Sequence, residues 1–170
     1  FDGDGALDLA AGVEGFAYLW HGAGDGSFTS PGPTYLISGF SQRIAVGEFN
    51  GDGHADFVMT TDNTELITIF YGAGDGQNLT PAEIDLNAGG VESPIAADLD
   101  GDGWQDLALI AGGRVVVLRN DAGFFQAGPV MPAVRGPSSL AAADMDADGH
   151  LDLLVTSAAE NELVVLLNTL

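Results

Sequence analysis

The sequence predicts an all-β fold built from repeated, four-stranded antiparallel sheets. An acidic stretch recurs, and its equivalent residues Asp2, Asn50, Asp100 and Asp146 are separated by 48, 50 and 46 residues. Between these stretches lie short runs rich in β-branched and aromatic residues, bounded by glycine turns, which is typical of strands. A four-stranded unit repeated every 40 to 50 residues indicates a β-propeller, in which each repeat is one blade. A stacked β-solenoid is the alternative arrangement, although its coils are usually shorter.

The acidic stretch is nine residues long, and its third copy runs from Asp98 to Asp106. Further copies run from Glu48 to Asp56 and from Asp144 to Asp152, and the chain opens inside a fourth copy that lacks position 1. Acidic or amide side chains stand at positions 1, 3, 5 and 9, position 6 is always glycine, and position 4 is glycine or alanine. Like charges this close together are unfavourable unless a cation lies among them.

The chemistry of these side chains predicts calcium, because Ca²⁺ takes six to eight oxygen ligands. Glycine at position 6 allows the sharp reversal that wrapping an ion requires. We expect up to four ions, one per loop, with positions 1, 3, 5 and 9 binding through side chains and position 7 (Ala6, His54, Trp104, His150) through its backbone carbonyl. The predicted ligands are Asp2, Asp4, Ala6, Asp8, Glu48, Asn50, Asp52, His54, Asp56, Asp98, Asp100, Asp102, Trp104, Asp106, Asp144, Asp146, Asp148, His150 and Asp152.

Other metal sites fit the loops less well. An EF-hand needs Glu at position 12 and flanking helices, whereas position 12 here is Met59, Leu109 or Val155 within a strand-like run. The nine-residue calcium repeats of β-helices have a much shorter period. Ligands that are all oxygen argue against zinc or copper, and magnesium demands a tighter octahedral geometry.

Each repeat is expected to contribute four strands in the same order. A run rich in small residues precedes the loop, a second run follows it, a third run ends at a glycine turn, and a proline-bearing segment comes last. Small residues suit a crowded innermost strand, and proline suits an outer edge, where a missing N–H costs least. The repeats cover roughly residues 1–39, 40–89, 90–135 and 136–170, and they contain three, four, four and three strands.

The first repeat lacks its innermost strand and the last lacks its outermost one, which makes about three and a half blades. Because propellers close with about four to eight blades, we expect this segment to be part of a larger propeller. Further blades from the same or another chain would close the ring.

Composition excludes several partners. The 170-residue chain carries a formal net charge of −21, its only basic residues are four arginines, and more than half of its 25 acidic residues lie in the four loops. Nucleic acid is excluded as a partner because phosphate binding needs clustered positive charge. Membrane insertion is not expected, since no apolar run approaches the length of a spanning helix. There is no cysteine, so a fold outside the cell cannot be stabilised by disulfides, and bound metal ions can stabilise it instead.

Residues outside the ligand set have simpler interpretations. We expect His21 to be a surface or turn histidine, and Arg119 to be solvated. The Trp104 indole is expected to pack against the neighbouring blade rather than to stack on a sugar. Asp25 and Asp75 lie in Gly-Asp-Gly sequences and are predicted to form hairpin turns.

The four loops, with the glycine turns that lead into Ser27-Phe28 and Phe124-Phe125-Gln126, resemble the FG-GAP/VCBS repeat family, which includes the heads of integrin α-subunits. This resemblance implies a propeller, usually of seven blades, with calcium between the first two strands of a blade. It also implies an extracellular or cell-surface location. Two departures occur in the second loop, where Glu48 is longer than Asp and Asn50 is neutral, so its site should be the weakest of the complete ones.

The sequence therefore predicts an extracellular, calcium-binding propeller module with a structural, adhesive or protein-interaction role, and its protein or glycan ligand is not identified. A glycan-binding lectin of the same fold is one alternative, and a part of a polysaccharide lyase is another. Catalysis has little support, because the chain has no Gly-x-Ser-x-Gly or His-Glu-x-x-His motif, no lysine and no cysteine.

Overall fold

The computed structural model describes residues 1–29, 32, 34–37, 41–61, 64–128, 131–132 and 134–169, and these contain strands and turns but no helix. The strands are β1 (Leu9–Val13), β2 (Phe16–Trp20), β3 (Tyr35–Leu36), β4 (Ser41–Gly47), β5 (Asp56–Thr61), β6 (Leu66–Gly72), β7 (Leu79–Asp85), β8 (Val91–Ala97), β9 (Asp106–Ala111), β10 (Arg114–Asp121), β11 (Phe124–Ala127), β12 (Pro137–Ala143), β13 (Asp152–Ser157) and β14 (Glu162–Leu166). Within this part of the chain, no helix is long and apolar enough to cross a membrane.

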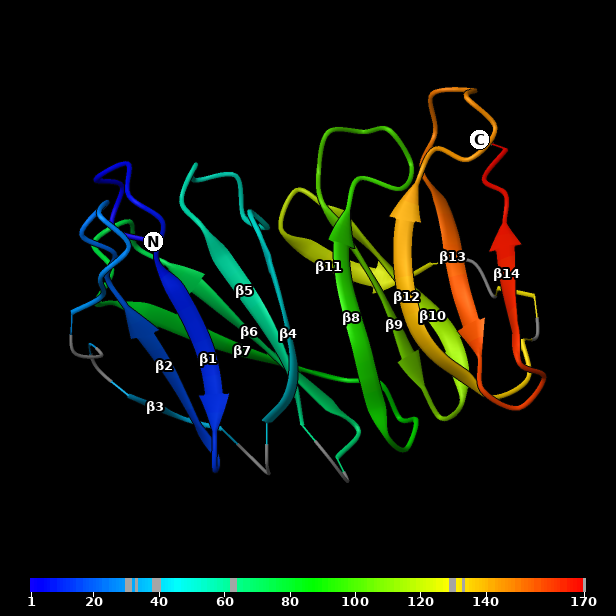
Figure 1. Ribbon diagram of the computed structural model, residues 1–170, viewed down its shortest axis with the longest axis horizontal. Helices are drawn as coiled ribbons and strands as arrows, with labels where there is room; N and C mark the ends of the chain where they lie inside the picture. The colour runs from blue at the N-terminus through cyan, green and yellow to red at the C-terminus, as the bar shows by residue number, and fades with distance from the viewer. Residues whose placement is uncertain are drawn as a thin grey trace.

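The strands form four antiparallel sheets, which we call blades 1 to 4. Blade 1 contains β1 to β3, blade 2 contains β4 to β7, blade 3 contains β8 to β11, and blade 4 contains β12 to β14. In each blade the strands pair in chain order, as in a meander. The blades stand side by side in sequence, and the acidic loops lie together at one end of them (Figure 1). The predicted all-β fold and its three, four, four and three strands are confirmed.

The first strands of blades 2, 3 and 4 lie where the blades approach one another. Strand β4 contacts β8, and β8 contacts β12. All three contain the small residues that such an approach requires, and the pairing of each with its neighbour shifts register before the loop. These shifts are β-bulges, which increase the local twist of a strand.

The core lies between the blades, in three apolar clusters. Leu19 of blade 1 packs with Phe57 and Phe70 of blade 2, and two similar clusters join blade 2 to blade 3 and blade 3 to blade 4. Every residue of β5 and β9 is buried, because each of these strands is covered by a neighbouring blade on both faces. This explains why neither sequence alternates between apolar and polar residues: after the initial aspartate, β9 is entirely apolar, and β5 has three apolar residues followed by two buried threonines.

The two terminal blades each keep one face uncovered. Leu9 and Val13 are exposed on β1, and Leu163 and Val165 are exposed on β14. The four sheets therefore form a row of blades and not a closed ring.

The outer strands differ most from expectation. In the third repeat the outer strand, β11, spans Phe124–Ala127 and so ends before the first proline of its proline-bearing segment. Pro81 lies in the edge strand β7, as predicted, and Pro132 lies outside any strand. Three further prolines of these segments, Pro31, Pro33 and Pro129, fall outside the described residues.

Replacing Phe57 by Ala should destabilise the fold severely. The side chain is completely buried and stacks on Phe70 with ring centroids 4.9 Å apart. Large-to-small changes of this kind cost about 3–5 kcal/mol. Chemical denaturation should show this loss, whereas Phe124→Ala, at a ring that is 75% exposed, should change stability by only about 0.5 kcal/mol. Equal losses in the two variants would contradict the assignment of the core.

Candidate metal centre

In blades 2 to 4 the acidic loop joins the first two strands, and in blade 1 it precedes β1. Each loop reverses direction through two left-handed residues. Position 6 is a glycine with positive φ in every loop, for example 93° at Gly103. Position 4 is left-handed as well, including Ala147 at a φ of 62°. Backbone conformation is thus a reason for the small residues at position 4, and Ala147 is a strained exception to the glycine that such a conformation favours.

The aspartate at position 9 ties three parts of a blade together. Asp106 is fully buried. Its Oδ2 accepts the N–H of Leu99 at position 2 of the loop, at 3.0 Å, and its Oδ1 accepts the N–H of Asn120 near the end of β10, at 2.8 Å. Asp56 and Asp152 make the same pair of bonds in blades 2 and 4. These carboxylates therefore hold the loop closed as well as being predicted ligands.

Burial of this aspartate acts to raise the pKa of its carboxyl group. Burial raises the pKa of Asp106 above its ordinary 3.8, and the carboxylates of Asp100 and Asp102 add to the rise, while its two backbone N–H partners oppose it. The pKa of Asp56 is raised for the same reasons. At Asp8, burial also acts to raise the pKa, but hydrogen bonds from the N-terminal amine, Gly22 and Asp2 lower it overall.

The third and fourth loops gather positions 1, 3 and 9 around one point. In the third loop, carboxylate oxygens of Asp98, Asp100 and Asp106 all lie within 4.8 Å of one another. The fourth loop gathers Asp144, Asp146 and Asp152 in the same way. Oxygen atoms that converge like this suit a hard divalent cation.

The second loop contains fewer charges. Its position 3 is Asn50, whose side-chain amide donates to Asp52 Oδ2 at 3.0 Å. Glu48 at position 1 accepts the backbone N–H groups of Asn50 and Gly51. Among the described residues of this loop, no three His, Cys, Asp or Glu side chains converge as they do in the other loops.

Positions 5 and 7 are used locally. The position-5 aspartates do not join the converging groups, and each accepts the N–H of position 7 in its own loop. The four pairs are Asp4 with Ala6, Asp52 with His54, Asp102 with Trp104, and Asp148 with His150. Binding through the position-7 carbonyls remains a prediction.

Trp104 connects the third loop with the second. A Cβ on Gly51 would lie only 2.5 Å from Cη2 of the Trp104 ring, so the indole packs closely over the backbone of the preceding loop. The prediction that Trp104 packs against the neighbouring blade is confirmed. Asp25 and Asp75 accept backbone N–H groups within their own turns, as predicted for hairpin turns.

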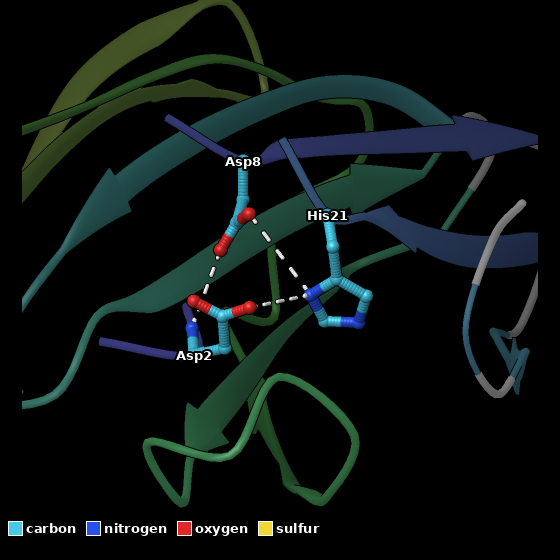
Figure 2. Close-up of side chains that lie close together, drawn as sticks. All are labelled: Asp2, Asp8 and His21. Atoms are coloured by element: carbon cyan, nitrogen blue, oxygen red, sulfur yellow. Dashed lines mark hydrogen bonds and ion pairs between the residues drawn. The ribbon is translucent and has the colours of Figure 1, made fainter. Parts of the chain in front are cut away.

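Two residues beside the loops were missed in the sequence. His21 Nδ1 lies 3.1 Å from Asp2 Oδ2 and 3.9 Å from Asp8 Oδ1 (Figure 2), and Arg119 Nε lies 3.6 Å from Asp100 Oδ2. Both were expected to be ordinary surface residues. Each directly precedes the residue whose N–H binds the position-9 aspartate, and this place in the repeat is the signal that could have found them.

Asparagine side chains extend the network between blades. Asn120 of blade 3 donates from Nδ2 to the carbonyl of Phe49 in the second loop, at 2.9 Å. Asn168 of blade 4 donates in the same way to the carbonyl of Leu99 in the third loop, at 2.5 Å. Position 2 is thus bound through its N–H by its own blade and through its carbonyl by the next one.

Replacing Asp106 by Asn should destabilise the chain even in a chelator. An amide cannot accept hydrogen bonds at both of its ends, so a buried backbone N–H would lose its partner, which costs about 1–3 kcal/mol. Asp100→Asn is the matched control, since Asn50 fills that position in the second loop, and it should stay within about 0.5 kcal/mol. Similar chelator-treated stabilities for both variants, measured by chemical denaturation, would show that Asp106 is not the structural tie.

A family model described as an FG-GAP-like repeat matches residues 1–59, 48–109 and 98–155. The second and third matches begin at Glu48 and Asp98, which are position 1 of their loops, so each match extends from one acidic loop past the next. A search of the curated proteins found no match. The matches together span most of the chain, and with the blades described above they show that it belongs to the FG-GAP-like repeat family.

Proposed function

We propose that the chain is a calcium-stabilised propeller module that acts outside the cell, with a structural and protein-interaction role rather than a catalytic one. The observation that carries this proposal is the third loop. Its three carboxylates converge within 4.8 Å, and Asp100 Oδ1 is a buried oxygen without a hydrogen-bond partner. A buried, unpaired carboxylate oxygen is unfavourable, and a cation among these oxygens would relieve the cost.

Calcium fits the donor set better than other common ions. In the third loop the ligands would be Asp98, Asp100, Asp102 and Asp106 with the Trp104 carbonyl, all of them oxygen donors, as calcium prefers. Asp102 would have to turn from the Trp104 N–H, or use its second oxygen, to join them. Each ion would also offset two of the 21 excess negative charges of the chain.

The proposed location outside the cell agrees with the same chemistry. Extracellular calcium modules typically bind at about 10⁻⁴–10⁻³ M, and sites of that affinity are well occupied only where calcium is near millimolar. The chain has no cysteine, so bound ions would take the stabilising role that disulfides have in many extracellular domains.

Calcium should raise the melting temperature of the chain, and a chelator should reverse the effect. At a tenfold excess over Kd, one site adds about 1.4 kcal/mol, or roughly 3–6 °C for a chain of this size. Asp100→Asn should lose about one site's share of the rise. Glu83→Gln, which removes an exposed acidic side chain of β7, should retain the full rise. A melting temperature that does not change when calcium is added would refute the proposal.

Calcium affinity should fall as the pH is lowered from about 7.5 to about 5. Burial and neighbouring carboxylates raise the pKa of Asp56 and Asp106 above 3.8, so protons compete with the ion at a higher pH than at an ordinary aspartate. Without calcium, these two groups affect the stability of the fold in the opposite direction to their effect on calcium affinity. Because the folded chain holds their protons more tightly than the unfolded chain, they contribute more stability as the pH falls through the raised pKa. Isothermal titration calorimetry at the two pH values tests the affinity, and equal affinities would contradict this role for the buried aspartates.

A further inference from the structure

The first loop differs from the others because an imidazole lies beside its carboxylates. Asp2, Asp8 and His21 each offer one ligand atom, and these atoms lie within 4.8 Å of one another. Asp2 and Asp8 belong to the loop, whereas His21 follows β2 (Figure 2). We propose that Asp2, Asp8 and His21 form a site for a transition-metal ion of the Zn²⁺ class, distinct from the oxygen-only loops.

The spacing of the three side chains fits a small divalent ion. Zinc binds histidine nitrogen and carboxylate oxygen at about 2.0–2.2 Å, so two ligands of a tetrahedral site are about 3.4 Å apart. The distances from His21 Nδ1 to Asp2 Oδ2 and to Asp8 Oδ1 are 3.1 and 3.9 Å, on either side of that value.

The imidazole nitrogen has no other partner. His21 Nδ1 is buried and makes no hydrogen bond, although Asp2 Oδ2 lies 3.1 Å away. A buried polar atom in this state is costly. An ion placed on the axis of the nitrogen lone pair would satisfy Nδ1 and could also bind the carboxylate oxygens beside it.

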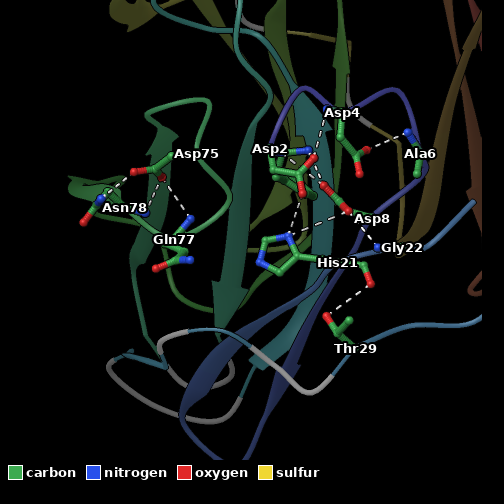
Figure 3. Close-up of polar contacts among 11 residues, drawn as sticks. Asp2, Asp4, Ala6, Asp8, His21, Gly22, Thr29, Asp75, Gln77 and Asn78 are labelled. Atoms are coloured by element: carbon green, nitrogen blue, oxygen red, sulfur yellow. Dashed lines mark hydrogen bonds and ion pairs between the residues drawn. The ribbon is translucent and has the colours of Figure 1, made fainter.

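The surrounding backbone holds His21 in this position. The next residue, Gly22, donates its N–H to Asp8 Oδ1 at 2.9 Å, and the His21 carbonyl accepts the N–H of Thr29 at 2.9 Å. The ring lies against the turn of blade 2 that contains Asp75 (Figure 3), where a Cβ on Gly76 would collide with it. The site is therefore built before any ion arrives, which lowers the cost of binding.

Chemistry separates this site from the other loops. Imidazole nitrogen suits zinc, copper, nickel and iron, whereas carboxylate and carbonyl oxygens suit calcium and magnesium. The residue equivalent to His21 is Tyr71 in blade 2, Arg119 in blade 3 and Leu167 in blade 4, because each directly precedes the residue whose N–H binds the position-9 aspartate. None of these three side chains offers an imidazole nitrogen, so at this place of the repeat only the first loop has one.

This site does not depend on calcium binding elsewhere, and the experiment separates the two. Metal-stripped protein is titrated with Zn²⁺ in about 10 mM calcium, a tenfold excess over the weaker end of the expected range. Calorimetry gives the stoichiometry and affinity, and nitrogen NMR of the three histidine rings shows which ring binds. We expect one zinc ion per chain at a site that excess calcium does not fill, with a shift of the His21 Nδ1 resonance.

Two variants test the assignment with residues that the repeats already use at these places. His21→Leu copies Leu167 of blade 4, and Asp2→Asn copies Asn50 of the second loop. Each should weaken zinc binding at least about tenfold, since even a supporting residue of a metal site is typically worth 10- to 100-fold. His54→Ala, which copies Ala6, should bind zinc like the parent chain.

Three results would overturn the proposal: no zinc binding in calcium, equal binding by the parent and His21→Leu chains, or a shift at His54 or His150 instead of His21. Circular dichroism of the metal-free variants checks that they are folded. If His21→Leu does not fold, Asp2→Asn provides the test. Asp100→Asn should lose calcium from the third loop and leave zinc binding unchanged.

Discussion

The buried aspartate at position 9 is the interaction on which each blade depends. One carboxylate accepts hydrogen bonds from the start of the acidic loop and from the end of the third strand, and its own backbone begins the second strand. Charge-assisted hydrogen bonds of this kind are roughly twice as strong as neutral ones, which offsets much of the cost of burying the charge. The remaining cost appears in the raised pKa of Asp106. The blade is therefore closed by a group that is still electrostatically unfavourable.

Much of this architecture could be predicted from the sequence, because it depends on local patterns. Strands follow from short β-branched runs between glycines, and the blade count follows from the period. Edge strands were harder to place. Strand β11 pairs through backbone groups, and three of its four residues are exposed and the fourth is half-buried, so its burial does not alternate regularly.

The site was only partly predictable, because its contacts join residues far apart in the chain. Acidity marks Asp106 as a ligand, but nothing marks the N–H of Asn120 as its partner 14 residues away. The sequence likewise does not show that Asp102 turns back to its own loop. The position of His21 depends on the register of β1 with β2, in which Leu9 pairs with Trp20, and a shift of one residue would point the ring away from the loop.

The blades share one backbone plan, but they differ in the residue that directly precedes the N–H donor to Oδ1 of the position-9 aspartate. Histidine, tyrosine, arginine and leucine occupy that place in blades 1 to 4. Only the arginine brings a permanent positive charge to its loop, where it lies 3.6 Å from Asp100. The backbone of the blade repeats, but the side chain beside each acidic loop differs from one blade to the next.

The asparagine bonds between blades give this repeat array a direction. The peptide at position 2 of a loop is completed by the blade that follows, through Asn120 for the second loop and Asn168 for the third. Gly22 and Gly72 stand at the corresponding places in blades 1 and 2, so they cannot reach back in this way. In an array whose units interact with their nearest neighbours, each of these two loops therefore depends on the blade that follows it, and loss of the Asn168 bond would leave the Leu99 carbonyl of the third loop without this partner.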